Sequence, residues 1–154
     1  MSFQDYLAYR KDGIKKKISE HYTIFNVVNS ATAMSRKIDN RPTAQNIINA
    51  TALAKNVLEK IPFPFRINCW LRNAVLNKAV GGVPTSQHQS AQAVDITPTK
   101  DKLELVYQWI KKNLVYDQVI LEESNNAKWI HISFSLVKNR KQALRLVNGK
   151  YIAG

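Results

Sequence analysis

Two apolar runs flank a short turn-forming segment in the second half of the chain, and this pattern constrains the fold most. Residues 117–122 and 128–134 are rich in Val, Ile, Leu and Trp, and the segment 124–127 between them reads Ser-Asn-Asn-Ala. Apolar β-forming runs joined by residues that tolerate positive φ are typical of a β-hairpin. The sequence therefore predicts two adjacent antiparallel strands here.

The register of this hairpin decides which side chains share a face. If Glu123 pairs with Lys128, His131 lies opposite Ile120. Because side chains alternate along a strand, His131 then shares its face with Gln118 and Glu122, while Glu123 points away. A bulge of one residue would exchange the two glutamates.

Outside the hairpin, the sequence pattern predicts a mixture of helices and strands. Apolar spacing near 3.6 residues indicates an amphipathic helix over 44–60, with Thr43 as its N-cap. Further helices are expected over 71–80, over 103–113, after Gly13 and from about Ser30. Strands are expected over 65–70 and 93–96, and residues 22–28 are rich in β-forming residues. Beyond Lys138 we expect a basic tail with a turn at Asn148-Gly149.

Composition narrows the class of protein. The 154 residues are enough for a single domain over 1–154, and the one cysteine, Cys69, excludes an internal disulfide or a cysteine-rich zinc site. The net charge of +12 favours polyanionic partners. We expect no membrane span and no signal peptide, and so a protein made in a cytoplasm without its own export signal.

Two of the three histidines fall near predicted strands together with a carboxylate. His88 and Asp95 are separated by seven residues, and His131 follows in the second strand of the hairpin. Imidazole nitrogens and a carboxylate are ligands that Zn²⁺ accepts while one position stays open for water. The set predicts one catalytic zinc ion. Each residue taken alone is also compatible with a structural role, as a core histidine or a capping aspartate.

The spacing of these residues resembles a known family. The segment Ser86-x-His88-x2-Ala91-x-Ala93-x-Asp95 is similar to the signature of the zinc peptidases that cleave peptidoglycan stem peptides, the D-alanyl-D-alanine carboxypeptidases and L-alanyl-D-glutamate endopeptidases. Trp129-x-His131 matches the family's Trp-x-His. Segments 38–42, 72–82 and 116–122 resemble the phage and bacterial branch, so the resemblance covers about residues 22–135 in the right order.

This resemblance implies a fold and a site. The fold would be α+β and Hedgehog-like, a small antiparallel sheet flanked by helices with the zinc site on the sheet and a core over about 22–137. The metal ligands would be His88, Asp95 and His131. Arg72 would face the substrate and bind a carboxylate or the oxyanion, although a surface helix arginine is the alternative. The approach to the metal would be lined by Ser86, Gln87, Gln118 and Trp129, with loop support as an equal alternative for Ser86.

Two residues depart from the family pattern. Ala91 replaces a glycine, which would cost on the order of 1 kcal/mol if the position requires positive φ. Many relatives carry the catalytic glutamate three residues before the last histidine, where this chain has Lys128. The hairpin register assigns the general base to Glu122, with Glu123 as the choice if a bulge is present.

The sequence thus predicts a zinc metallopeptidase that acts on bacterial peptidoglycan at the cell wall, phage-encoded as an endolysin or carried in the virion. The alternative is a catalytically impaired virion structural or wall-binding protein that retains the zinc site and has other virion proteins as partners. Nucleic-acid binding has only the charge in its favour, because Trp70, Trp109 and Trp129 lie in apolar segments rather than on a basic stacking platform.

Overall fold

The predicted hairpin forms the middle of the sheet in the computed structural model, which describes residues 2–99 and 101–154. Strands β3 (Gln118–Ser124) and β4 (Ala127–Ser133) pair antiparallel. Asn125 and Asn126 connect them at φ 49° and 65°, the left-handed pair of a tight hairpin turn. Glu123 pairs with Lys128 and Ile120 with His131, so the predicted register is confirmed and no bulge intervenes.

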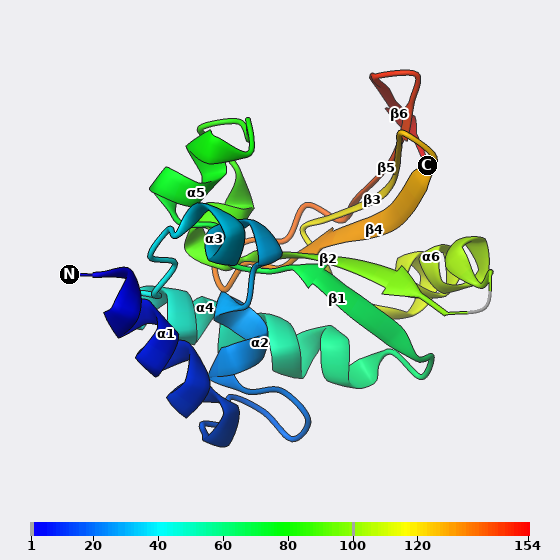
Figure 1. Cartoon of the computed structure of the whole chain (residues 1–154). Helices are drawn as coiled ribbons and strands as arrows, with labels where there is room; N and C mark the ends of the chain where they lie inside the picture. Colours follow the sequence, from blue (N-terminus) through cyan, green and yellow to red (C-terminus); the bar gives the residue numbers. More distant parts are fainter. Residues whose placement is uncertain (1, 100) are drawn as a thin grey trace.

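Four more strands complete a six-stranded sheet in the order β1-β2-β4-β3-β5-β6 (Figure 1). The added strands are β1 (Phe65–Cys69), β2 (Ala93–Pro98), β5 (Gln142–Val147) and β6 (Lys150–Ala153). Neighbouring strands run antiparallel except β3 and β5, which are parallel. The sheet is therefore mixed rather than wholly antiparallel, because the chain crosses past β3 after leaving β4.

The C-terminal segment is part of this sheet. Sequence patterning indicated only a basic tail beyond Lys138 with a turn at Asn148-Gly149. The turn is present, with φ 49° and 73° at its two residues, and it joins β5 to β6 as a second hairpin. The strand character was hard to detect because every residue of β6 is exposed and β5 is buried only in part.

Helices occupy much of the remaining chain. They are α1 (Phe3–Asp12), α2 (Ile24–Val28), α3 (Ala31–Arg36), α4 (Ala44–Asn56), α5 (Ala74–Ala79) and α6 (Leu103–Asn113). The prediction for 103–113 is confirmed residue for residue. Thr43 caps α4 as expected through a hydrogen bond from the Asn46 backbone N–H to its side chain, and the 44–60 segment ends as a 3₁₀ turn, Leu58–Lys60.

Two sequence-based predictions at the N-terminus were wrong. The first helix precedes Gly13 rather than following it, because Ser2 and Asp5 form a capping box that starts it early. Residues 24–28 form helix α2 rather than a strand. Thr23 and Asn26 satisfy each other's backbone N–H groups at its start, and this local hydrogen bonding outweighs the β preference of the apolar residues.

The two faces of the sheet differ sharply in chemistry. Side chains on one face are buried in the hydrophobic core with helices α4 and α6, and they include Val94, Ile96, Val119, Ile130 and Ile132. Strand alternation places Asp95, His131, Ile120 and Glu122 on the opposite face. Over that face α5 and the β5–β6 hairpin rise on either side in Figure 1. Within the described residues, no helix is long and apolar enough to cross a bilayer.

Candidate metal centre

Asp95 and His131 form a direct cross-strand pair on β2 and β4. Their side chains point to the polar face, and Asp95 Oδ1 lies 3.1 Å from His131 Nδ1. Because both residues belong to strands in the interior of the sheet, neighbouring ladder hydrogen bonds fix their backbones on both sides. The two candidate ligands are therefore in direct contact.

His88 approaches the same carboxylate from a 3₁₀ turn, η3 (Gln87–Ser90), which precedes β2. Its Nε2 lies 3.2 Å from Asp95 Oδ1, the oxygen that also contacts His131. The two imidazole rings are 5.2 Å apart between centroids and tilted by 69°. One carboxylate oxygen thus stands between two imidazole nitrogens, an arrangement able to hold a small cation.

The other nitrogen of His88 fixes the orientation of its ring. Nδ1 lies 2.7 Å from the backbone carbonyl oxygen of Trp70, which can only accept a hydrogen bond. Nδ1 must therefore carry the proton, and the lone pair of Nε2 faces Asp95. A histidine oriented by a backbone carbonyl in this way is typical of metal ligands.

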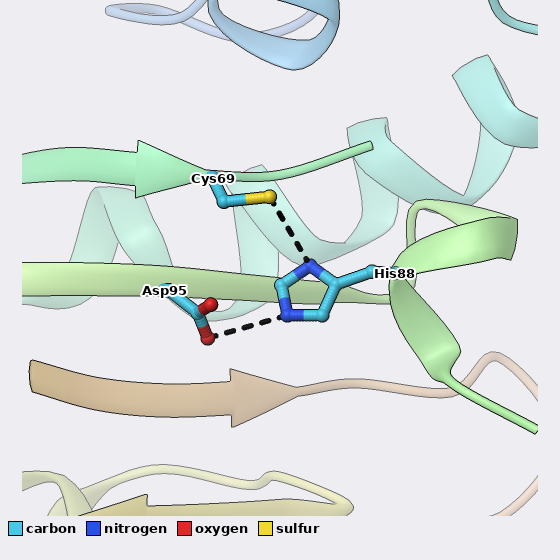
Figure 2. Close-up of side chains that lie close together, drawn as sticks. All are labelled: Cys69, His88 and Asp95. Carbon is cyan, nitrogen blue, oxygen red and sulfur yellow. Dashed lines mark hydrogen bonds and ion pairs between the residues drawn. The ribbon is translucent and has the colours of Figure 1, made fainter. Parts of the chain in front are cut away.

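Cys69 also lies close to this group, as Figure 2 shows. Its Sγ is 4.0 Å from His88 Nδ1, whereas Asp95 contacts Nε2 on the other side of the ring. Cys69, His88 and Asp95 are near enough to suggest a metal group, but one imidazole cannot direct both nitrogens at the same ion. Burial and the charge of Asp95 also raise the pKa of the Cys69 thiol to about 12, so the metal-binding thiolate is disfavoured. The two imidazole nitrogens that contact Asp95 Oδ1 are His88 Nε2 and His131 Nδ1.

Ala91 adopts the left-handed conformation that the family glycine suggested. Its φ and ψ are 59° and 21°, directly after the turn that carries His88. Its carbonyl oxygen accepts a hydrogen bond from the Trp70 indole at 3.2 Å, and its N–H donates to the carbonyl of His88. The methyl group is fully buried in the core. The loop therefore retains its shape, with a strain on the order of 1 kcal/mol offset by these contacts.

A cavity of about 830 Å³ opens over this group. Every residue named as part of the site from the sequence lines it: His88, Asp95, His131, Glu122, Arg72, Ser86, Gln87, Gln118 and Trp129. Ser86 also supports the loop, since its hydroxyl accepts a hydrogen bond from the backbone N–H of His88. Both readings of Ser86 are therefore compatible with its position.

Arg72 brings its guanidinium group to this cavity. Its Nη2 contacts the Ser86 hydroxyl at 3.3 Å, and its backbone N–H donates to the carbonyl of His88. Its Nε is buried, and no hydrogen-bond partner for it is found within the described part of the chain. A buried, unpartnered guanidinium nitrogen favours an anionic ligand, because leaving it without a partner costs free energy.

The two adjacent glutamates of β3 lie in different environments. Glu122 lines the cavity on the same face as His131, and burial is the main reason that its pKa is raised above the ordinary value. Glu123 points away with a side chain that is 55% exposed, and it pairs with Lys128 at 3.5 Å. A carboxyl with a raised pKa at a polar cavity, as Glu122 is, is typical of residues that transfer protons in catalysis.

The sequence analysis missed the cavity residues of the C-terminal segment, which are Arg140, Leu146 and Tyr151. Arg140 binds the buried carboxylate of Asp117 through two nitrogens at 2.8 and 2.6 Å, and Gln87 donates to the same carboxylate at 3.0 Å. Arg140, Leu146 and Tyr151 belong to the C-terminal segment, which the family resemblance did not reach. The only local signal was the turn-forming Asn148-Gly149 pair.

Comparison with known proteins agrees with this geometry. The sequence model described as Peptidase M15 matches residues 20–133, a span that contains Arg72, His88, Asp95, Glu122 and His131. No protein with a curated description matches the chain. The C-terminal hairpin lies beyond the matched span.

Proposed function

Because this chain belongs to the Peptidase M15 family, the zinc D-Ala-D-Ala carboxypeptidase family, we propose that it is a zinc-dependent peptidase that hydrolyses stem or cross-link peptides of bacterial peptidoglycan. The observation that carries the proposal is the convergence of His88 Nε2, Asp95 and His131 Nδ1 at a cavity that also holds Glu122. Metal ligands and a candidate base are thus brought to one place by different elements.

The proposed ligands of one zinc ion are His88, Asp95 and His131. Their donor atoms suit zinc, and the His88 ring is already oriented by Trp70 with its free lone pair toward the other two. When bound, zinc supplies a lowered pKa for coordinated water and polarises a peptide carbonyl. The open cavity above the three residues leaves room for water and substrate.

Glu122 is the proposed general base and acid. Its carboxyl lies on the cavity face, and its raised pKa suits a group that accepts a proton from water and passes it to the leaving amine. Lys128 does not replace the family glutamate in the cavity, because the confirmed register pairs it with Glu123 on the other face. This arrangement supports activity despite the departure from the family pattern.

Arg72 is proposed to bind a carboxylate of the substrate or the oxyanion. The support is the position of its guanidinium at the cavity, where a fixed positive charge would bind a carboxylate or oxyanion. Ser86 is proposed to hold Arg72 through its hydroxyl. Gln87, Gln118 and Trp129 are proposed to line the path of the peptide, since all three border the cavity.

The bacterial cell wall is the proposed site of action. The net charge of +12 favours binding to an anionic cell wall. We further propose a phage-encoded enzyme, either an endolysin or a virion-associated peptidase, on the resemblance of segments 38–42, 72–82 and 116–122 to that branch. The second candidate function, a virion structural or wall-binding protein, is favoured by Ala91 and Lys128 alone.

The two glutamates of β3 give a matched test of the enzymatic proposal. Zinc-loaded wild type, Glu122→Gln and Glu123→Gln would be incubated with purified sacculi, and released peptides measured by mass spectrometry. We expect Glu122→Gln to lose about 10²–10⁴-fold in rate and Glu123→Gln to stay within about twofold of wild type. Full activity of Glu122→Gln would remove it from the mechanism, and no release by zinc-loaded wild type would favour the binding role. The masses of the products would also identify the bond that is cut.

A further inference from the structure

The C-terminal hairpin contributes a wall to the candidate active site. Leu146 of β5 and Tyr151 of β6 line the same cavity as His88, Asp95 and His131. Both residues lie beyond the segment 20–133 that matches the family. The wall is therefore an addition to the part of the chain that defines the family.

The strand registers explain why these two side chains point into the cavity. Ile120 pairs with Leu144 across the parallel β3–β5 pair, so Leu146, two residues further, lies on the same face beside Glu122. Leu146 and Tyr151 are directly opposite partners in the β5–β6 hairpin and share that face. One row of cavity side chains thus runs from Trp129 through Glu122 and Leu146 to Tyr151, two residues along β4 from His131.

Arg145 and Ile152 confirm the alternation by lying on the other face. They form the adjacent pair in the hairpin, and Arg145 binds Glu104 of α6 and stacks over the ring of Tyr107 at 5.0 Å. This ion pair ties β5 to α6 on the face of the sheet opposite the cavity. The exposed fractions of Tyr151 and Ile152 are 59% and 49%, so the two side chains differ mainly in the direction they face.

The two ends of the cavity differ in chemistry. Arg72 follows β1 at one edge of the sheet and offers an unpartnered cationic donor, with Ser86 beside it. Tyr151 lies on β6 at the opposite edge and offers an aromatic ring next to the aliphatic Leu146. A ligand that spans the cavity would therefore carry a carboxylate at one end and an uncharged, apolar portion at the other.

We propose that Tyr151 and Leu146 are specificity-determining residues that contact the uncharged portion of the peptide substrate, on the side of the scissile bond away from Arg72. This inference rests on the proposed peptidase function. The ring of Tyr151 supplies a rigid contact surface at low entropic cost, and its hydroxyl can donate to a peptide carbonyl. Burial, with a smaller contribution from the charge of Glu122, raises the pKa of Tyr151, so the hydroxyl keeps its proton at neutral pH.

Three single variants of the zinc-loaded full chain test this proposal. Tyr151→Ala removes the ring, Tyr151→Phe removes only the hydroxyl, and Ile152→Ala is the matched control from the opposite face of β6. The probe would be a synthetic stem peptide with a free C-terminal carboxylate, measured by steady-state hydrolysis. We expect Tyr151→Ala to raise KM about 10-fold with kcat within about twofold, and Ile152→Ala to leave both unchanged. Tyr151→Phe should fall between wild type and Tyr151→Ala.

A binding measurement separates failure of this inference from failure of the proposed function. Calorimetry with the same peptide would be repeated in the Glu122→Gln background, where turnover is suppressed. Equal KM and equal affinity for Tyr151→Ala and Ile152→Ala would overturn the inference while leaving the peptidase proposal intact. If wild type binds the peptide but does not hydrolyse it, weaker binding by Tyr151→Ala alone would still support a contact between Tyr151 and the peptide. No binding by wild type would overturn the inference together with the proposed substrate class.

Discussion

Asp95 and His131 face each other across β2 and β4, and the Asp95 oxygen that contacts His131 also contacts His88. Three side chains from a turn and two strands are thus brought to one point by the register of the sheet. Replacing one of these side chains at a time therefore tests the proposed ligand set.

Replacing His131 by alanine should remove most of the bound zinc. Two remaining donors hold a divalent ion far less tightly than three, so elemental analysis should fall from close to one zinc per chain to a small fraction. His21→Ala is the control: His21, Glu20 and Glu59 form another group able to hold a metal ion, so zinc retained by this variant would locate the ion at the cavity. A full complement of zinc in the His131→Ala protein would refute the proposed ligand set.

Cys69→Ala should keep its zinc. The thiol lies on the Nδ1 side of His88, where the Trp70 carbonyl already accepts the proton, and the proposed ligands are on the Nε2 side. Zinc content and affinity measured by competition with a chelator should stay within about threefold of wild type, less than the 10–100-fold typical of losing a group that orients a ligand. Loss of the metal in this variant would instead make Cys69 a ligand.

Ala91 offers a test of the backbone of the ligand turn. Ala91→Val should destabilise the protein by more than about 2 kcal/mol, because a β-branched residue is disfavoured at a φ of 59° and the site is fully buried. Ala91→Gly should stay within about 1 kcal/mol, since relief of strain is offset by the lost methyl contacts and the flexibility of glycine. Urea unfolding of both variants checks this. Equal stability of the valine variant and wild type would contradict the left-handed assignment.

The ion pair between Arg140 and Asp117 should make stability depend on pH in the acid range. Hydrogen bonds from Arg140 are the main cause that lowers the pKa of Asp117 from 3.8 to about 2. A carboxyl with a lowered folded-state pKa stabilises the protein fully above about pH 4, and this contribution is lost as the pH falls through about 2. Arg140→Ala should therefore cost about 1–2 kcal/mol at pH 7 and little at pH 2.

Thermal or urea unfolding across this range would measure the effect, with Lys138→Ala as the control for removing a nearby positive charge. A loss for Arg140→Ala that is the same at pH 7 and pH 2 would show that the side chain acts through packing instead of through Asp117.

Local signals in the sequence were sufficient for the centre of the sheet. The turn-forming Asn125-Asn126 pair set the register of β3 and β4, and that register alone separated Glu122 from Glu123. The same kind of short-range chemistry placed Thr43 at the start of α4. His88, Asp95 and His131 could be recognised as candidate ligands from their residue types and spacing, and their binding of a metal stays a prediction.

Long-range pairing could not be read in this way. The parallel contact of β5 with β3 joins segments separated by the whole of β4, and no alternation of burial marks β6. Leu146 and Tyr151 therefore escaped detection although they border the same cavity. At the N-terminus the difficulty was the reverse, since the side-chain hydrogen bonds of Ser2 and Thr23 outweighed the apolar patterns around them.

Trp70 links the hydrophobic core to the metal centre. Its ring is fully buried, its carbonyl orients His88, and its indole N–H holds the carbonyl of Ala91 at the end of the same turn. A single core residue thus clamps both ends of the segment that carries one proposed ligand. Loosening of the core around this indole would free the His88 side chain without any change to the ligand residues themselves. Zinc affinity should therefore be a sensitive reporter of the protein's folded state.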